Sequence, residues 1–378
     1  MRFWSARINS KSRRNGFLSL LACAVLSTNA ALAQGDELKS VQYREDGAIS
    51  QQVGMPIYSW QSNSVSPRGV VLAIHGLVMH GKSYDQLGRT LAAQGFAVYA
   101  TDLRGYGRCG SEHHHEFCKL PDCKQKIDYE KSFTDLVKLS HALKQQYPSV
   151  PFYCVGESLG GAMAIKLSSK YPELINGLVL SAPAIKRHNF FDPYLIAQAA
   201  SWIAVNPTAK IDVMPFVRKF ASDDPEVIVE LQHDPLLRTH LSAYELLKSH
   251  NAVRKTISYV PGIKPEIPVL VIQGSADRCI KANAVMLLLS KLRSDDQTVK
   301  WFHQRGHILL ETKHVKPDTM DSVVMWISDH ADEHQLQVKE NDREHTSAHG
   351  HQLHQRSVFQ FESNGRAIYR PVSGESDR

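Results

Sequence analysis

The sequence lacks the features of several protein classes. It has no internal repeat and, beyond its amino-terminal segment, no apolar run long enough to cross a bilayer. Its net charge of +6 overstates the charge of the body, because the first 33 residues hold five basic residues and no acidic one, which leaves +1 for the remainder. A nearly neutral body argues against a nucleic-acid-binding surface, so we expect no nucleic acid among the partners.

The amino-terminal segment is typical of an export signal rather than of a folded element. A basic start is followed by an apolar stretch over 16–27 and by Ala31-Leu32-Ala33, a small-residue cleavage site before Gln34. We therefore predict a signal peptide at residues 1–33 and an exported bacterial protein, either periplasmic or secreted. The alternatives are twin-arginine export through Arg13 and Arg14, a lipoprotein cut at Cys23, and an uncleaved membrane anchor.

Cysteine is scarce, and its spacing disfavours a metal centre. Beyond the signal segment five cysteines remain, an odd number that leaves at least one thiol unpaired in an oxidising compartment. We expect Cys154, on a buried strand, to be unpaired, and at least one disulfide to form among Cys109, Cys118 and Cys123. The nearby His113–His115 suggest zinc as an alternative, but paired C-x-x-C spacing is missing, so we predict no metal.

The most informative pattern present surrounds Ser158. The apolar run 151–154 leads into Val155-Gly156-Glu157-Ser158-Leu159-Gly160-Gly161, which is typical of a nucleophile elbow: a buried strand, a sharp turn that carries serine, and small residues that open a helix. Glycine two residues before and after the serine is needed because side chains there would collide with the neighbouring strand or helix. The pattern predicts a serine hydrolase.

A serine nucleophile needs a histidine base and an acid that orients it, in the chain order Ser, Asp, His. Asp277 follows a buried strand over 267–274, at the carboxyl end where the sites of open α/β sheets collect. His307 lies in the loop after the next strand, over 298–302, and we choose it as the base over His303, which lies at the strand end. The alternative for Asp277 is a cap of the helix that starts near Lys281.

The oxyanion of acyl transfer needs two backbone N–H donors. One is the amide of Leu159, directly after the predicted nucleophile. The other is predicted at Leu77, because the buried strand over 69–74 ends in His75-Gly76-Leu77. We expect His75 to brace this loop by hydrogen bonding rather than to take part in the chemistry.

The order of elements predicts an α/β fold with a doubly wound, mainly parallel sheet. Helical and strand patterns alternate from residue 82 to residue 181 and again from residue 268 to a last helix over 319–330. Between about 182 and 265 the alternation fails: helical patterns and Asp-Pro breaks occur there without a convincing buried strand. We expect this insertion to form a helical cap over the site of a hydrolase domain that spans 34–332.

The chain resembles the monoacylglycerol lipase and lysophospholipase group of α/β-hydrolases over roughly residues 55 to 330. The resemblance implies Ser158, Asp277 and His307 as the catalytic triad, Leu77 and Leu159 as oxyanion donors, and no cofactor. It departs at Glu157, where many members carry histidine, and in a long polar loop between Cys109 and Cys123. The motifs that carry it are His75–Tyr84, Asp102–Gly107, Gly156–Gly161, Gly274–Arg278 and Gly306–Glu311.

The same resemblance implies a carboxylic ester hydrolase that cleaves monoacylglycerols or lysophospholipids through an acyl-enzyme. A peptidase or amidase and a short-chain esterase are the enzymatic alternatives on this fold, and a binding protein with an inactive triad is the non-enzymatic one. The apolar segment Pro193–Ala204 is expected to pack within the cap. The resemblance further suggests that it lines an acyl-chain pocket and touches a membrane surface transiently.

The tail over 333–378 differs in composition from the rest. It is polar and histidine-rich, with little apolar surface to bury, so we predict that 333–356 is disordered. Two short apolar segments flank Asn364-Gly365, a pattern that predicts a terminal hairpin over 358–369.

Overall fold

The structure is a computed structural model of the chain. It describes residues 41–63, 66–110, 126–185, 206, 208–354, 360–361 and 367–368. The chain divides into two compact units, Met1–Ile327 and Ser328–Arg378. The predicted signal peptide, most of the loop between Cys109 and Cys123, and the apolar segment Pro193–Ala204 all lie outside the described residues.

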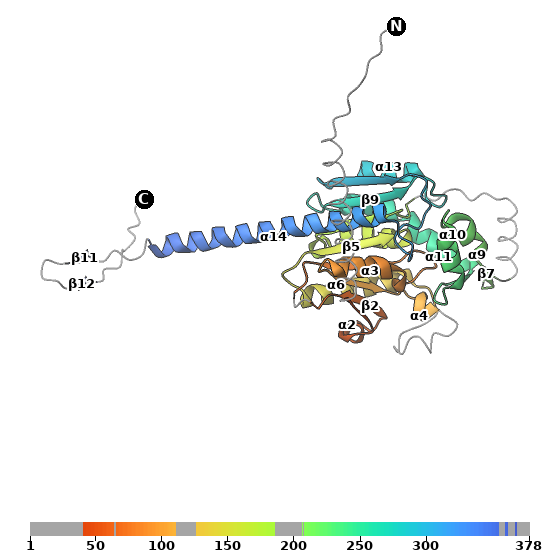
Figure 1. The fold of residues 1–378 in the computed structure, drawn as a ribbon, viewed down its shortest axis with the longest axis horizontal. Coiled ribbons are helices and arrows are strands. Elements are labelled where there is room, and N and C mark those ends of the chain that lie inside the picture. The colour runs from red at the N-terminus through yellow and green to blue at the C-terminus, as the bar shows by residue number, and fades with distance from the viewer. Residues whose placement is uncertain are drawn as a thin grey trace, which may run out of the picture. The chain divides into compact units, whose positions relative to one another are not determined.

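An eight-stranded sheet forms the centre of the first unit (Figure 1). Its strand order is β1-β2-β4-β3-β5-β6-β9-β10, with antiparallel pairs β1–β2 and β2–β4 and parallel pairs elsewhere. The mainly parallel sheet was predicted, but the edge strand β1 and its antiparallel neighbour β2 were not. The strands are β1 (Gln42–Glu45), β2 (Ile57–Gln61), β3 (Val70–Ile74), β4 (Ala97–Thr101), β5 (Phe152–Glu157), β6 (Gly177–Ser181), β9 (Val269–Gly274) and β10 (Gln297–Phe302).

The connecting helices cover both faces of the sheet. From β3 the chain steps to β4 on one side and then returns past β3 to β5 on the other. Because crossovers between parallel strands are right-handed, this reversal puts the first helix on one face and the later ones on the opposite face, which confirms the doubly wound arrangement. The helices are α3 (Asp85–Ala93), α6 (Tyr129–Gln146), α7 (Leu159–Lys170) and α13 (Ala282–Lys291).

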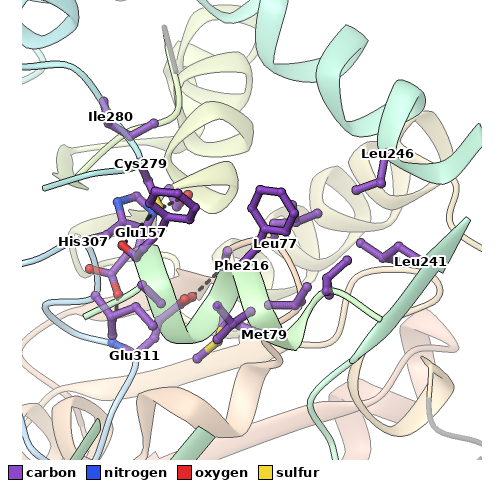
Figure 2. A pocket seen from close by; sticks show the side chains of 18 of the residues that line it. Leu77, Met79, Glu157, Phe216, Leu241, Leu246, Cys279, Ile280, His307 and Glu311 are labelled. Atoms are coloured by element: carbon purple, nitrogen blue, oxygen red, sulfur yellow. Dashed lines mark hydrogen bonds between the residues drawn. The ribbon is translucent and has the colours of Figure 1, made fainter. Parts of the chain in front are cut away.

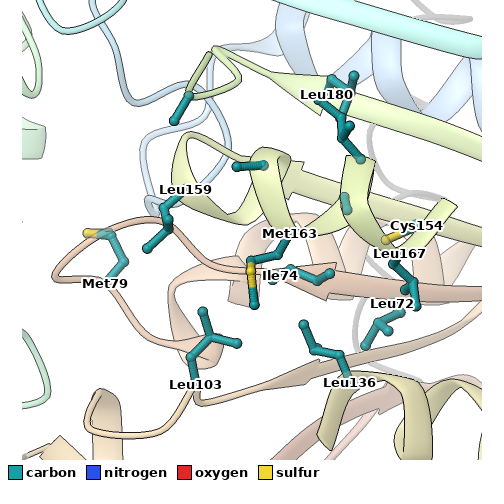
Figure 3. Close-up of a cluster of buried hydrophobic side chains, with 14 of the residues drawn as sticks. Leu72, Ile74, Met79, Leu103, Leu136, Cys154, Leu159, Met163, Leu167 and Leu180 are labelled. Carbon is teal, nitrogen blue, oxygen red and sulfur yellow. The ribbon is translucent and has the colours of Figure 1, made fainter. Parts of the chain in front are cut away.

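The central strands are buried along their whole length because both faces are covered. Every residue of β3, β4, β5, β6 and β9 is buried. Side chains of β3 and β5 pack with those of α6 and α7 in one continuous core, in which Ile74, Leu103 and Met163 lie close to the elbow (Figure 3). This core supports the residue that precedes each loop of the site.

The chain leaves the sheet after β6 and returns to it at β9. The intervening elements are β7 (Lys210–Asp212), α9 (Met214–Phe220), α10 (Pro225–His233), β8 (His240–Ser242), α11 (Ala243–Arg254), α12 (Thr256–Tyr259) and η3 (Val260–Gly262). A capping box between Ser242 and Glu245 starts α11, and Asp224 with Pro225 starts α10. The sequence showed no convincing buried strand here, and the structure has two short ones, β7 and β8, which pair as a small antiparallel sheet. Strands of three residues are too short to show an alternating pattern.

We call the segment between β6 and β9 the cap, and the loop over 75–79, which carries the predicted donor Leu77, the oxyanion loop. Arg238 attaches the cap to the oxyanion loop. Its backbone N–H donates to the carbonyl oxygen of Val78 at 2.9 Å. Its guanidinium is buried, donates to the carbonyl oxygen of Gly105 and forms an ion pair with Glu245 at 2.7 Å. The cap therefore shares hydrogen bonds with the loop that it covers.

The remaining elements are short helices between the strands and the elements of the carboxyl-terminal segment. They are α2 (Ala48–Val53), η1 (Gly81–Tyr84), α4 (Gly107–Gly110), η2 (Pro172–Leu174), α14 (Pro317–His354), β11 (Gln360–Phe361) and β12 (Ala367–Ile368). No helix within the described ranges has both the length and the apolar content needed to span a bilayer. Cys109 takes part in a disulfide, as expected for that loop, and Cys154 is a buried free thiol, as predicted.

The expectation that 333–356 is disordered was wrong as far as His354, because α14 continues through this segment. Up to His354 the segment contains no proline, and its three Glu, three Gln and two Leu favour helix once a helix has been nucleated. The predicted hairpin is present: β11 and β12 pair antiparallel on either side of Asn364-Gly365.

Gly160 is predicted to be essential for stability, because α7 approaches β3 most closely there. A Cβ atom at Gly160 would lie 1.8 Å from the carbonyl oxygen of Ile74, whereas one at Gly47 would have nothing within 4 Å. We expect Gly160→Ala to lower the free energy of unfolding by at least about 3 kcal/mol, and Gly47→Ala by less than about 0.5 kcal/mol. Denaturant unfolding checks both; equal stability of the two variants would contradict the close approach.

Candidate active site

Ser158 occupies the sharp turn between β5 and α7. Its backbone has φ 54° and ψ −115°, a left-handed conformation that is unusual for a residue with a side chain. A Cβ at Gly156 would lie 2.5 Å from the backbone of Gly160. The strained turn and its need for glycine on both sides, predicted from the sequence, are therefore confirmed.

Ser158, His307 and Asp277 form a continuous hydrogen-bonded chain. His307 Nε2 lies 2.9 Å from Ser158 Oγ, and His307 Nδ1 lies 2.9 Å from Asp277 Oδ2. The carboxylate accepts the proton on Nδ1, so Nε2 is left to accept from the serine hydroxyl. The structure thus brings together the three residues that the sequence predicted, from positions that are far apart in the chain.

Asp277 is held as an anion within a buried turn. Burial by itself raises the pKa of its carboxyl, but His307 and several hydrogen bonds outweigh burial and lower the pKa below its ordinary value. Oδ1 accepts from the backbone N–H groups of Cys279 (2.7 Å) and Ile280 (2.9 Å), and Oδ2 accepts from Gln273 Nε2 (2.7 Å). Asp277 does not cap α13, whose N-cap residue is Lys281.

Strand register explains why these loops meet. Gly274 at the end of β9 is paired with Phe302 at the end of β10, so the loops that carry Asp277 and His307 leave neighbouring strand ends. The His307 loop also contacts the cap, because the N–H groups of His307 and Ile308 both donate to the carbonyl oxygen of Ala221. His303, the alternative base, is exposed at the strand end and does not belong to the hydrogen-bonded chain of Ser158, His307 and Asp277.

The two predicted oxyanion donors border Ser158. Ile74 is paired with Gly156 in the sheet, which brings the loop with Leu77 beside the elbow. Leu159 is the first residue of α7, and the first N–H of a helix has no acceptor within its own helix. The Leu77 loop is itself tightly bent, with φ 68° at Val78, a conformation that is costly for a β-branched residue.

His75 braces the oxyanion loop, as expected. Its ring is fully buried, Nδ1 donates to the carbonyl oxygen of Gly76 at 2.8 Å, and Nε2 accepts from the N–H of Leu103 at 2.9 Å. Burial lowers the pKa of His75 to about 4, so the ring is neutral, consistent with these two hydrogen bonds.

A cavity of about 580 Å³ opens at the Ser158–His307 pair (Figure 2). This volume is typical of a small-molecule site. The loop residues Leu77, Val78 and Met79 form one wall, and the cap supplies most of the rest. In Figure 2, Leu241 and Leu246 lie on the opposite side of the cavity from His307. Apolar cap residues on the walls are Ile211, Val213, Phe216, Val217, Phe220, Ala221, Leu241 and Leu246.

Two buried glutamates at the site had no role in the sequence-based prediction. Glu157 was noted only as a departure from the usual elbow, and Glu311 only as the end of the last motif. Both line the cavity and are almost inaccessible to solvent. The available signal for Glu311 was its position directly after the apolar run Ile308–Leu310. A charged residue beside such a run is rarely buried unless it has partners.

Among the described residues, one group of side chains has metal-ligand chemistry: Asp277, Cys279 and His307, whose ligand atoms lie within 4.8 Å of one another. Asp277 and His307 already satisfy each other by a hydrogen bond, and His307 also bonds Ser158. The zinc alternative at Cys109 involves residues that mostly lie outside the described ranges.

Solved structures of similar fold are lipases and esterases. A monoacylglycerol lipase from Paleococcus ferrophilus superposes with a TM-score of 0.57 at 24% identity, covering 70% of this chain and 96% of that chain. A soluble variant of monoglyceride lipase from Saccharomyces cerevisiae gives 0.60 at 20% identity, covering 76% and 94%. These similarities confirm the α/β-hydrolase fold.

Sequence comparison identifies relatives along most of their length. A monoacylglycerol lipase of Mycolicibacterium smegmatis is 26% identical over 274 residues, which cover 72% of this chain and 93% of the relative. A monoglyceride lipase of Mus musculus is 27% identical over 271 residues, 70% of this chain and 84% of the relative. The family model described as Hydrolase_4, serine aminopeptidase, S33, matches residues 65–313, more than half of the chain, and the chain therefore belongs to this family of α/β-hydrolases.

Proposed function

We propose that the protein is a carboxylic ester hydrolase that cleaves single-chain lipid esters of the monoacylglycerol type. The observation that carries this proposal is the apolar cavity of about 580 Å³ that opens directly at Ser158 and His307. The named activities of the related monoacylglycerol and monoglyceride lipases support it. Lysophospholipid, the other single-chain substrate that we considered, differs at the head group rather than along the chain.

The site performs acyl transfer in two steps. His307 accepts the proton of the Ser158 hydroxyl while Oγ attacks the ester carbonyl, and Asp277 stabilises the imidazolium that forms. The N–H groups of Leu77 and Leu159 bind the oxyanion of the tetrahedral intermediate. His307 then returns the proton to the leaving alcohol oxygen. Water, deprotonated by the same base, hydrolyses the acyl-enzyme and releases the fatty acid.

The exposed apolar side chains of the cap support contact with a lipid surface. Phe216 on α9 and Tyr244 and Leu247 on α11 are exposed, and Phe216 also lines the cavity. Arg218 and Lys219 beside Phe216 are exposed cations. Apolar residues combined with cations suit transient binding at the interface of an anionic membrane. We propose that substrate passes from such a surface into the cavity.

We also propose that the protein is exported after removal of residues 1–33. The disulfide at Cys109 supports an oxidising compartment. If export occurs, the protein recovered from the cell envelope should begin near Gln34. Amino-terminal sequencing checks this; an intact Met1 would favour an uncleaved anchor, and a lipid-modified Cys23 would favour a lipoprotein.

Ser158 and His307 are predicted to be indispensable. Ser158→Ala and His307→Ala should each lower kcat for a monoacylglycerol by about 10⁶, as for other serine triads. Ser158→Ala should also abolish labelling by a fluorophosphonate probe. His303→Ala is the matched control, since this histidine is exposed and we expect its rate within about twofold of wild type. A loss at His303 equal to that at His307 would contradict the choice of base.

The length of the acyl chain should determine the rate until the cavity is full. Each buried CH₂ favours the transition state by up to about 0.8 kcal/mol, so kcat/KM should rise several-fold per added carbon. Leu246→Trp should reduce the volume at the far end and lower kcat/KM for long chains by about tenfold, with butyryl esters little affected. The control is Met286→Trp, at an exposed apolar residue of α13 outside the cavity lining.

Hydrolysis of p-nitrophenyl esters of increasing length, monoacylglycerol and an aminoacyl amide measures these profiles. A rate that falls steadily from acetyl upward would favour a short-chain esterase. Cleavage of the amide alone would favour a peptidase.

A further inference from the structure

Glu157 and Glu311 are buried carboxyl groups close to the reacting residues, and neither has a place in the acyl-transfer steps. Their exposed fractions are 0% and 2%. Figure 2 shows both beside His307 on the wall of the cavity. A charged carboxylate is costly to bury, so each group needs partners that explain its retention.

Four donors surround the carboxylate of Glu157. Oε1 accepts from Ser181 Oγ (2.5 Å) and from the N–H groups of Leu309 (2.8 Å) and Leu310 (3.2 Å), and Oε2 accepts from the N–H of Glu311 (2.9 Å). Backbone N–H groups can only donate, so both carboxyl oxygens of Glu157 act as acceptors. This arrangement suits an ionised carboxylate. Burial raises the pKa of Glu157 above its ordinary value, although these hydrogen bonds and the nearby His307 act in the opposite direction, so the case for an anion rests on the four donors.

Glu311 has the opposite environment. Its Oε1 accepts the N–H of Gly76 at 2.6 Å, and its other neighbour is the hydroxyl of Tyr84. That hydroxyl donates its hydrogen to the carbonyl oxygen of Ile74 at 3.0 Å. A hydroxyl oriented in this way accepts from the N–H of Glu157 at 3.1 Å and can only accept from Glu311, and a protonated carboxyl supplies the matching donor. Burial and the neighbouring Glu157 raise the pKa of Glu311 well above its ordinary value, and they outweigh the hydrogen bonds of Gly76 and Tyr84, which act in the opposite direction.

Glu157 and Glu311 connect the three loops that carry the nucleophile, the base and one oxyanion donor. Glu157 directly precedes Ser158 and binds the backbone directly after His307 and Ile308. Glu311 belongs to that same segment and binds Gly76, the residue before Leu77. The nucleophile, the base and one oxyanion donor are thus joined by two carboxyl groups across 152 to 235 residues of sequence.

We propose that Glu157 is an anionic positioning residue that holds the His307 loop against the elbow and adds negative charge beside the imidazolium, and that Glu311 is its neutral, protonated partner, which holds the oxyanion loop. This inference rests on the proposed acyl-transfer function. Glu157 acts through His307 and the backbone and does not touch the reacting atoms.

The pKa of His307 depends on every charged or titratable group that faces its ring. From the loop after β9, Asp277 and Cys279 face the ring, and from the end of β5, Glu157 does. Glu311 lies in the segment after the histidine and is neutral in this proposal. From the cap, Asp223 lies near Gly306 but is paired with Arg278 at 2.5 Å. Glu157 and Asp277 are then the two anions that stabilise the imidazolium, and removal of either should lower the pKa of His307.

Amide replacements separate the two roles. In Glu157→Gln the NH₂ group must face backbone donors and the negative charge is lost, so we expect kcat to fall about 10- to 100-fold with little change in KM. The acid limb of the kcat/KM profile should move to lower pH, because the imidazolium loses a neighbouring anion. In Glu311→Gln the amide reproduces the neutral acid: its oxygen accepts from Gly76 and its nitrogen donates to Tyr84, so we expect a loss below about threefold.

The experiment measures pH–rate profiles of wild type, Glu157→Gln and Glu311→Gln, together with the rate at which a fluorophosphonate labels Ser158. Glu130→Gln, at a solvent-exposed carboxyl, is the control for the substitution itself and should retain wild-type rates. A purely structural role would lower the rate without moving the acid limb. If both amide variants are equally damaged, or if the acid limb stays in place in Glu157→Gln, the proposal is overturned.

Two further measurements keep the test decisive. If Glu157→Gln does not fold, Ser181→Ala removes one of its four donors and should lower kcat about 3- to 10-fold; an unchanged kcat would contradict the proposal. If wild type cleaves no ester, the proposed substrate is wrong, but the labelling rates still compare the two glutamates. Failure of the substrate assignment and failure of the carboxyl pair therefore give different results.

Discussion

The close approach of α7 to β3 is the constraint on which the rest of the site depends. The backbone of Gly160 lies so near the carbonyl of Ile74 that no side chain fits between them. The turn at Ser158, which has a left-handed conformation, lies two residues before this contact, and the first N–H of the helix lies between the two. One backbone contact therefore sets the position of the elbow against β3, and side-chain hydrogen bonds hold the loops around it.

The parallel sheet brings together residues that are far apart in the sequence. Each reacting residue follows the carboxyl end of a strand, and those ends meet at a single edge of the sheet because neighbouring strands run in the same direction. Loops are normally the least rigid part of such a fold, and here they are joined by buried hydrogen bonds from Glu157, Glu311 and His75. Because the groups are buried, each hydrogen bond is expensive to break, which keeps the site assembled between turnovers.

The cap has a different physical role. Its apolar side chains face the reacting residues and create a space from which water is readily displaced by an acyl chain. It is also joined to the catalytic loops, through Arg238 to Val78 and through Ala221 to His307 and Ile308. A movement of the cap would therefore be transmitted to both the oxyanion loop and the base.

The sequence by itself determined the elbow, the order of strands and helices, and the choice of Asp277 and His307. These depend on local patterns: glycine at fixed spacing, apolar runs, and a polar residue directly after a strand. Only the tertiary structure decided the antiparallel pairing of β1 with β2 and of β2 with β4, the β7–β8 pair, the size of the cavity and the partnership of Glu157 with Glu311. The physical reason is that each of these is a contact between distant segments, and such contacts leave no periodic signal in either segment alone. The helix that continues to His354 shows the converse, since composition indicated disorder where a helix already nucleated by the preceding residues extends.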